Sequence, residues 1–414
     1  MIFREMLLKE NKDGFIEKTG SKMNYDKDFY EITKQYIYSE EFDNDMKRLE
    51  QGDYFFDLPK CLLIKKSKSN RRRKVFVFED HNKIILQYLN YMLIRKYDHV
   101  FSDDLYSARV RSRNLSLFYR LRRLDPDRKY YVVKSDIHRY SESIDAKALE
   151  KQLRSFCTDD QEFVDFIIWL ITRNKYYLNG EIVEGYTSVM GGNPTAGFFY
   201  NVNLMDVDKL MADKGLLYCR YSDDVCLVCR TKEEAEANMA LLTEELGKLN
   251  LEFNEDKSAI LQPGEDLDLL GIKFANGYTD ISDNTFSKVT NKFKHRANSL
   301  NRAVRKGKFT REQAAGIMSR IISSYLYGNE KMANENGHVH KWIDRFFPAI
   351  TSAERLKLID AVAEDCIRFV GTGRKTNAKY RITYTDIKKL GFTPLVYTYY
   401  RRYEADKANR AIEK

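Results

Sequence analysis

Proline is scarce in this chain, with 6 among 414 residues, and no segment is of low complexity. Linkers between domains are typically rich in proline or of low complexity, so we expect closely packed domains. No run of 18 apolar residues occurs, which predicts no membrane span and no membrane partner. The first residues include acids and no long apolar core, so we predict no signal peptide and a cytoplasmic protein.

The chain also has few cysteines and histidines, six of each. Cys226 and Cys229 form a CxxC pair, a pattern that also occurs in zinc sites. On a strand, however, residues three apart face opposite sides, whereas zinc ligands of this spacing sit on a turn. His338 and His340 lack a second ligand pair. We therefore predict reduced core cysteines, surface histidines and no zinc site.

Basic residues are abundant. The formal net charge is +9 and the pI is near 8.9, which favours a polyanionic partner. Seven of the ten residues 65–74 are basic, and Lys and Arg recur between 288 and 308. The length allows two or more domains. The patterns predict an α+β chain with an N-terminal helical extension over residues 1–60 and an almost wholly helical region over residues 286–414.

An acidic hairpin is the strongest local signal. Tyr221-Ser222-Asp223-Asp224 stands between two apolar, strand-forming runs, which predicts a tight turn with two carboxylates. A second strand-like run, residues 130–137, carries Asp136 near its end. Side by side, these strands would gather three carboxylates, whose repulsion a divalent cation relieves. Oxygen ligands of this kind suit Mg²⁺, and two ions about 4 Å apart can support phosphoryl transfer.

Six segments in this order resemble the motif series of the reverse transcriptases, in particular the bacterial ones. They are residues 101–109 (a fingers segment), 136–144, 191–197 with Asn201 and Asp208, 221–224, 251–258 and the primer-gripping turn at 270–274. A lone YxDD box is a weak signal, whereas six motifs in the right order are specific. The resemblance covers about residues 60–290.

The resemblance implies a right-hand polymerase fold and an enzyme. Fingers and palm, an antiparallel sheet with helices, would span residues 61–285, followed by an α-helical thumb and C-terminal region over 286–414. The implied activity is RNA-directed DNA polymerisation from dNTPs by two Mg²⁺ ions, with Mn²⁺ as an alternative. The implied partners are an RNA template, the DNA product and dNTPs. The resemblance leaves a homo-oligomer open.

The same resemblance assigns roles to individual residues. Asp136, Asp223 and Asp224 would hold the metal ions, with the Ile137 backbone beside the incoming triphosphate. Lys257 would donate a proton to the departing pyrophosphate or neutralise it. Read alone, the acids would be a solvated strand end and turn, and Lys257 a surface lysine. The other implied nucleotide-binding residues are Arg73, Lys74, Tyr140, Ser141, Gly192 and Asn193.

Nucleic-acid contacts are expected from the basic run and from the region after the palm. Lysine and arginine contact phosphates without reading sequence. A solvated charged hairpin is the alternative for the basic run. The residues expected to bind nucleic acid are Lys65, Lys66, Arg71, Arg72, Gly271 and Lys292.

Two departures from the family pattern concern the nucleotide pocket. Gly191 stands where the family usually has Gln, and Ala196-Gly197 where it has Ser-Pro. Ser141 stands where the family has Phe or Tyr, a ring that blocks a ribose 2′-hydroxyl, and the aromatic residue Tyr140 comes one position earlier. Either Tyr140 swings into the pocket or the gate is open, with weaker discrimination between deoxyribo- and ribonucleotides.

Several subgroups remain open. The compact palm, drifted gate and helical C-terminus favour a stand-alone bacterial enzyme of antiphage defence, similar to the abortive-infection group, with an associated non-coding RNA. A retron enzyme that makes RNA-linked DNA is one alternative, although Val289-Thr290-Asn291 poorly matches the retron thumb motif. An untemplated, protein-primed polymerase and an inactive RNA-binding protein are others. The intact Asp136, Asp223, Asp224 and Lys257 argue against the last.

Overall fold

The computed structural model describes residues 2–21, 26–65, 72–110, 114–328, 339 and 341–402. The chain forms two compact units. One comprises the N-terminal region up to Leu117 together with Tyr130–Pro263, and the other comprises Phe118–Lys129 and the chain from Gly264 onward. Helices and mainly antiparallel sheets combine as the α+β prediction requires.

The first unit holds two four-stranded sheets and most of the helices. Its helices are α1 (Ile2–Leu7), α2 (Lys9–Gly20), α3 (Lys27–Ile37), α4 (Glu40–Glu50), α5 (Asp80–Tyr97), η1 (Asp98–Val100), α7 (Tyr140–Ser143), α8 (Ala146–Phe156), α9 (Gln161–Thr172), α10 (Ala196–Asn203), α11 (Met205–Met211), α12 (Lys232–Lys248) and η2 (Glu255–Lys257). Its strands are β1 (Lys60–Lys65), β2 (Arg72–Val77), β3 (Tyr131–Asp136), β4 (Tyr176–Leu178), β5 (Glu181–Val183), β6 (Leu217–Tyr221), β7 (Asp224–Cys229) and β8 (Ala259–Leu261).

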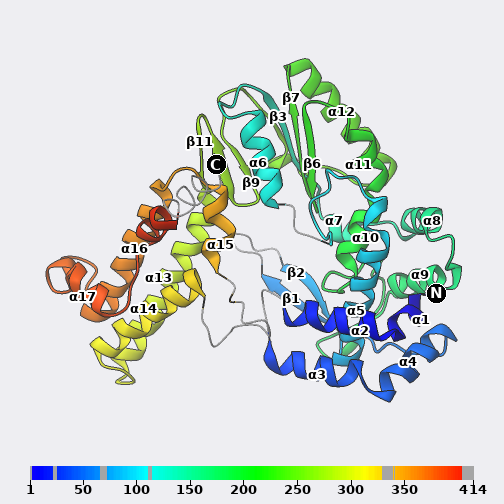
Figure 1. The fold of residues 1–414 in the computed structure, drawn as a ribbon, viewed down its shortest axis with the longest axis horizontal. Helices are drawn as coiled ribbons and strands as arrows, with labels where there is room; N and C mark the ends of the chain where they lie inside the picture. Colours follow the sequence, from blue (N-terminus) through cyan, green and yellow to red (C-terminus); the bar gives the residue numbers. More distant parts are fainter. Residues whose placement is uncertain are drawn as a thin grey trace, which may run out of the picture. The chain divides into compact units, whose positions relative to one another are not determined.

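The sheet that carries the acidic hairpin has the order β6-β7-β3-β8, and its strands are antiparallel (Figure 1). Apolar runs from β3, β6 and β7 are buried, and α12 packs on β3 and β7. Cys226 and Cys229 both lie within β7, and all six cysteines are free and buried, so the prediction of reduced core cysteines is confirmed. His338 and His340 lie outside the described residues.

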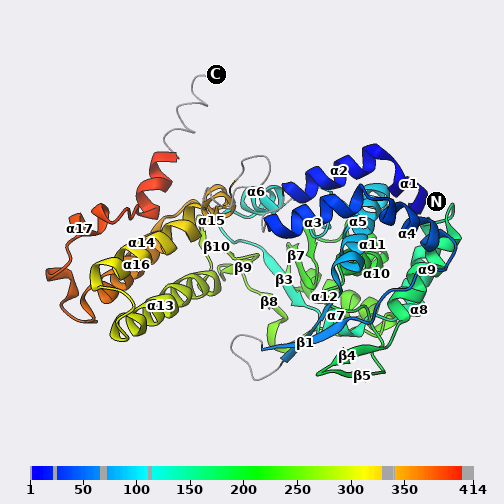
Figure 2. The same cartoon turned by 90° about the horizontal axis from the view of Figure 1, so that it is seen from below.

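The other sheet has the order β2-β1-β4-β5. β1 and β2 form an antiparallel pair that faces Lys65 with Arg72, and β4 joins β1 in parallel (Figure 2). A turn at Asn179-Gly180 links β4 to β5, and both residues have positive φ (53° and 92°), as a two-residue hairpin loop requires. Phe76 is 1% exposed and anchors β2 to the unit's core.

The N-terminal helices belong to the same unit as these sheets. Helices α1 and α2 pack on the apolar helix α5, and α1 also contacts α4. The Tyr88 hydroxyl on α5 donates to the Met6 carbonyl at 2.9 Å, and the Ile2 backbone N–H donates to Asp160, which caps α9. Figure 2 shows α1 and α2 beside α5, and α3 beside α2. Within the segment predicted to be helical, α1 to α4 lie between residues 2 and 50, whereas residues 51–59 form no helix.

The second unit combines a three-stranded sheet with a helical bundle. Its elements are most of α6 (Asn114–Leu124), β9 (Leu267–Leu269), β10 (Ile272–Ala275), β11 (Tyr278–Ile281), α13 (Asp283–Arg305), α14 (Arg311–Tyr327), α15 (Trp342–Phe346), η4 (Phe347–Ala349), α16 (Glu354–Thr372), η5 (Ala378–Tyr380) and α17 (Tyr384–Lys389). Helices α13, α14 and α16 pack on one another. Asp360 of α16 is buried and accepts backbone N–H groups of Leu395 and Val396, which fastens the following helical residues to the bundle.

None of the helices in the described ranges is long and apolar enough to cross a membrane.

Candidate active site

The strand register brings the three predicted carboxylates to one end of the sheet. Asp136, the last residue of β3, is paired with Asp224, the first residue of β7. Asp223 lies in the turn before Asp224, and its backbone carbonyl accepts the N–H of Ile137 at 3.0 Å. Because directly paired residues of an antiparallel sheet project from the same face, Asp136 and Asp224 lie side by side. The predicted convergence therefore exists in the fold.

Electrostatic repulsion is concentrated at Asp224. Burial raises the pKa of its carboxyl, and the neighbouring Asp223 and Asp136 raise it further, to about 6, although Lys134 and Lys257 counteract them. Asp136 is 8% exposed. Ionised carboxylates that lie together in a partly buried site are unfavourable unless a cation binds between them.

Lys257 supplies one positive charge at this place. Its Nζ atom lies 2.7 and 3.0 Å from the two Asp136 carboxylate oxygens. The loop that carries it is fixed to the same strand end, because the backbone N–H of Asn254 donates to the Asp136 carbonyl at 2.7 Å. Burial lowers the pKa of Lys257, but the contact with Asp136 outweighs it and leaves the pKa raised. The ammonium is therefore charged and placed beside the acids.

The donor set suits a hard divalent cation. All three side chains offer carboxylate oxygens, the ligands that Mg²⁺ prefers. Within the residues that the structure describes, no three His, Cys, Asp or Glu side chains are already gathered as a metal site. The raised pKa of Asp224 is the observation that fits a bound cation, because burial and then the charges of Asp223 and Asp136 disfavour its ionised form, which a cation would stabilise.

A buried ion pair lies directly beneath the acidic turn. Arg220, the residue before Tyr221 in β6, is 1% exposed and its guanidinium binds both carboxylate oxygens of Asp208 in α11, at 2.7 and 2.6 Å. The Tyr218 hydroxyl also donates to Asp208, at 2.9 Å. Burial lowers the pKa of Arg220, but Asp208 outweighs it and leaves it raised, so the guanidinium is charged.

This pair supports a strained residue of the turn. Ser222 has φ of +59°, a conformation that costs a non-glycine residue roughly 1–2 kcal/mol. The third nitrogen of Arg220, Nη1, donates to the Ser222 carbonyl at 2.9 Å, and the Ser222 N–H donates to the Ser107 hydroxyl at 2.9 Å. Ser107 is held in turn by Asn201 of α10, which donates to the Ser107 carbonyl at 2.9 Å. Contacts on both sides thus fix the turn that places Asp223.

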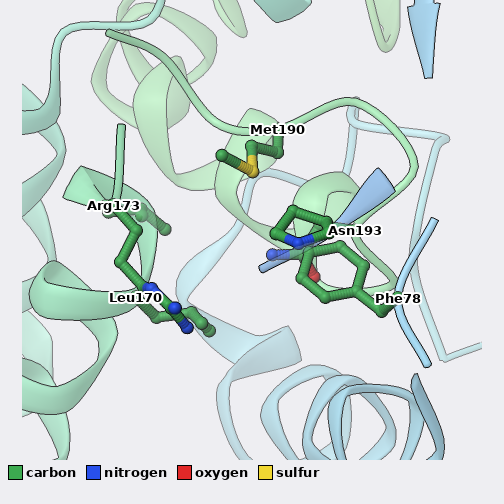
Figure 3. A pocket seen from close by; sticks show the side chains of 7 residues that line it. Phe78, Leu170, Arg173, Met190 and Asn193 are labelled. Atoms are coloured by element: carbon green, nitrogen blue, oxygen red, sulfur yellow. The ribbon is translucent and has the colours of Figure 1, made fainter. Parts of the chain in front are cut away.

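The glycine-rich segment is joined to β2. The N–H of Phe76 donates to the Gly191 carbonyl at 2.8 Å. Gly192 has φ of +104°, and a Cβ there would lie 2.5 Å from the Phe76 carbonyl oxygen, so only glycine fits. Asn193 is buried, accepts the N–H and hydroxyl of Thr195, and lines a small cavity with Phe78, Pro59, Leu170, Ile171, Arg173 and Met190 (Figure 3).

The predicted basic residues are distributed unevenly. Lys74 is half-buried and donates to the Tyr176 hydroxyl at 3.1 Å, above the rings of Tyr176 and Tyr186. Arg73 is exposed and acts electrostatically on the Tyr200 hydroxyl. Lys65 and Arg72 are exposed partners across the hairpin, whereas Lys66 and Arg71 lie outside the described residues. Gly271 and Lys292 belong to the second unit.

Two alternatives were predicted for the sugar gate: Tyr140 turns into the nucleotide pocket, or the gate is open. In the structure, the Tyr140 side chain is buried in the protein core. Tyr140 is 3% exposed and its hydroxyl donates to the Tyr200 carbonyl at 2.5 Å. Ser141 is half-buried, and its carbonyl accepts the hydroxyl of Ser188 at 3.2 Å.

Sequence reasoning assigned no role to Arg220, Ser107 or Tyr200. Arg220 did carry a signal, because a charged residue at an inward position of an apolar strand needs a buried partner. Ser107 and Tyr200 carried none, since their roles depend on which loops the fold brings beside the turn.

Comparisons with known proteins agree with the motif series. The family model described as reverse transcriptase (RNA-dependent DNA polymerase) matches residues 64–274, half of the chain. Among solved structures, the chain is similar to the apo telomerase from Candida tropicalis truncated from its C-terminal domain, with 12% identity and a TM-score of 0.42. The similarity covers 54% of this chain and 55% of that chain, so the match spans about half the length of that relative. A search of curated proteins found no match.

We expect Asp208→Asn to lower the free energy of unfolding of the first unit by about 3–5 kcal/mol, because Arg220 would remain buried with its charge uncompensated. The double variant Asp208→Leu/Arg220→Met should regain most of this loss. Denaturant unfolding checks both. Glu236→Gln, which breaks an exposed pair with Lys232, is the control and should change little. An Asp208→Asn protein as stable as the wild type would contradict the assigned role.

Mg²⁺ binding should weaken as the pH falls through about 6. Asp224 is protonated below that pH, and a metal ion needs the carboxylate, so binding must release the proton. The apparent affinity should be constant above pH 7 and fall by up to about tenfold per pH unit below 6. Calorimetric titration at pH 5.0, 6.0 and 7.5 measures it. Asp224→Asn should bind weakly with a flatter pH dependence, and an equally steep one would assign the effect elsewhere.

Proposed function

Because the chain belongs to the reverse transcriptase family, we propose that it is an RNA-directed DNA polymerase that adds nucleotides from dNTPs to a growing DNA strand. The observation that carries the proposal is the arrangement of Asp136, Asp223 and Asp224 at adjoining strand ends with Lys257 on Asp136. Two Mg²⁺ ions held by these acids, with Mn²⁺ as the alternative, would stabilise the attacking and leaving oxygens of an in-line displacement.

The chain's own residues do the positioning. The Arg220–Asp208 pair and Ser107 hold the turn, so that Asp223 and Asp224 need no rearrangement when substrate arrives. Such preorganisation is a main source of catalytic power. Lys257 is placed to transfer a proton to the departing pyrophosphate or to neutralise it. Arg73 is exposed on β2 and acts electrostatically on Tyr200. This position supports a role for Arg73 in binding the triphosphate.

The second unit offers a surface for the nucleic-acid backbone. From position 288 on, α13 exposes only cations and neutral groups, and none of its basic residues forms an ion pair in the described part of the chain. Lys292 lies 4.0 Å from the centre of the Tyr325 ring. A basic helix of this kind binds phosphates without reading sequence. The exposed members are Lys288, Lys292, Lys294, Arg296, Arg302 and Arg305.

The biological role is proposed from the sequence departures. A drifted gate position, a drifted second motif and a helical C-terminus support a bacterial antiphage enzyme whose template is a dedicated non-coding RNA. Purification from a host that carries the native flanking DNA, followed by sequencing of all bound nucleic acid, tests this role. A cDNA complementary to one small RNA supports it, whereas untemplated DNA released only by protease would indicate protein-primed synthesis.

Replacing Asp223 and Asp224 together by Ala should lower dNTP incorporation on a primed RNA template by at least about 1,000-fold, since the metal ligands are lost. The thermal stability should stay the same or rise, because the repulsion at Asp224 disappears. Asp213→Ala, which removes an exposed acid of the same unit, is the matched control and should retain full activity. Retained incorporation in the double variant would refute the proposed catalytic site.

The double variant Lys292→Ala/Arg296→Ala should weaken binding to an RNA–DNA duplex and reduce the slope of log affinity against log salt by about 2, one for each lost phosphate contact. Fluorescence anisotropy between 50 and 300 mM salt, about the range where such slopes are measured, provides the values. Lys232→Ala/Lys248→Ala removes the same charge from α12, where both lysines already pair with glutamates. An equal loss in both double variants would show a general charge effect instead of an α13 surface.

A further inference from the structure

Tyr200 of α10 stands beside the gate position. Its ring is half-buried, and the Tyr140 ring lies against it with centroids 5.4 Å apart and planes tilted by 51°. The Tyr140 hydroxyl donates to the Tyr200 carbonyl, so Tyr140 fixes both the backbone and the ring of Tyr200. The core aromatic residue of the gate segment therefore serves as a support for a second aromatic residue.

The Tyr200 hydroxyl is affected by groups to which the proposed function gives roles in nucleotide and metal binding. Burial raises the pKa of Tyr200 to about 12, although Arg73 and a hydrogen-bonding contact with the Ser141 side chain lower it, and Asp223 raises it. The phenol is thus within electrostatic reach of a cation on β2 and of a carboxylate in the acidic turn. Under the proposed function, a nucleotide held by Arg73 and by metal ions at Asp223 would therefore lie near Tyr200.

Two hydrogen bonds hold the backbone of Ser141. Its carbonyl accepts the hydroxyls of Ser188 at 3.2 Å and of Tyr186 at 3.4 Å. A serine side chain leaves the volume of an aromatic ring unfilled, and packed proteins fill such volumes from neighbouring residues. Two half-buried tyrosines contact Ser141: Tyr186 contacts its carbonyl, and Tyr200 contacts its side chain.

We propose that Tyr200 is the specificity-determining residue for the sugar: its ring, backed by Tyr140 and adjacent to Ser141, limits the space beside the 2′ position of a bound nucleoside triphosphate. The gate is therefore closed from α10, although the gate position itself carries a small residue. The inference rests on the proposed polymerase function. It predicts that Ser141 can lose its hydroxyl without much effect, whereas loss of the Tyr200 ring admits ribonucleotides.

The test compares kcat/KM for a dNTP and for the matching rNTP in single-nucleotide incorporation. We expect wild type to prefer the dNTP and Tyr200→Ala to lower the dNTP/rNTP ratio by about 10- to 100-fold, the usual effect of opening a pocket to one additional group. The gain should lie in rNTP use, with dNTP use changed by only a few fold. Tyr200→Phe keeps the ring and should keep the ratio, and Ser141→Ala should also keep it.

Tyr177→Ala, which removes an exposed tyrosine of β4 in the same unit, is the matched control. Tyr200→Leu provides a second variant if the alanine protein unfolds early in a thermal melt. An unchanged ratio in folded, active Tyr200→Ala and Tyr200→Leu proteins would overturn the inference, as would a wild type that uses both nucleotides equally. If the wild type incorporates neither nucleotide, the proposed function fails instead. In that case, calorimetry measures the affinities of wild type and Tyr200→Ala for the dNTP and the rNTP. The ratio of the two affinities then tests the sugar preference.

Discussion

The buried pair between Arg220 and Asp208 is the interaction on which the acidic turn depends. Isolated, either charge would be costly in the core, and together they satisfy each other through two short hydrogen bonds. The pair leaves one guanidinium nitrogen free for the Ser222 carbonyl, and this contact holds a residue in a backbone conformation that it would otherwise avoid. A strained backbone conformation persists where several surrounding contacts fix it.

The rest of the site is arranged around that turn. β3 ends opposite it, so Asp136 faces Asp224, and the loop with Asn254 and Lys257 is tied to the same strand end. The acids come from two strands and a turn that are far apart in sequence, yet their relative positions follow from an ordinary antiparallel register. Burial and the neighbouring acids leave the pKa of Asp224 raised, which is the observation that supports the proposed metal site.

Much of this arrangement could be predicted from the sequence. Apolar, strand-forming runs predicted β3, β6 and β7. The convergence of three acids followed from strand ends alone. The support for the turn did not, because the hydroxyl of Ser107 and the amide of Asn201 could serve many loops, and only the fold selects Ser222. The orientation of Tyr140 was equally undetermined, since a helix of four residues can turn an aromatic ring inward or outward without a change in pattern.

The junction between Phe76 and the Gly191-Gly192 pair has a mechanical consequence. A backbone hydrogen bond and a contact too tight for any Cβ join β2 to the segment that leads into α10. The strand that carries Arg73 and the helix that carries Tyr200 are thus coupled at one point, and neither can shift far without breaking that bond. Under the proposed function, a rearrangement of the hairpin on binding of a triphosphate would shift Tyr200, the residue proposed to limit the space beside the sugar. Binding of the phosphates and selection of the sugar would then be coupled.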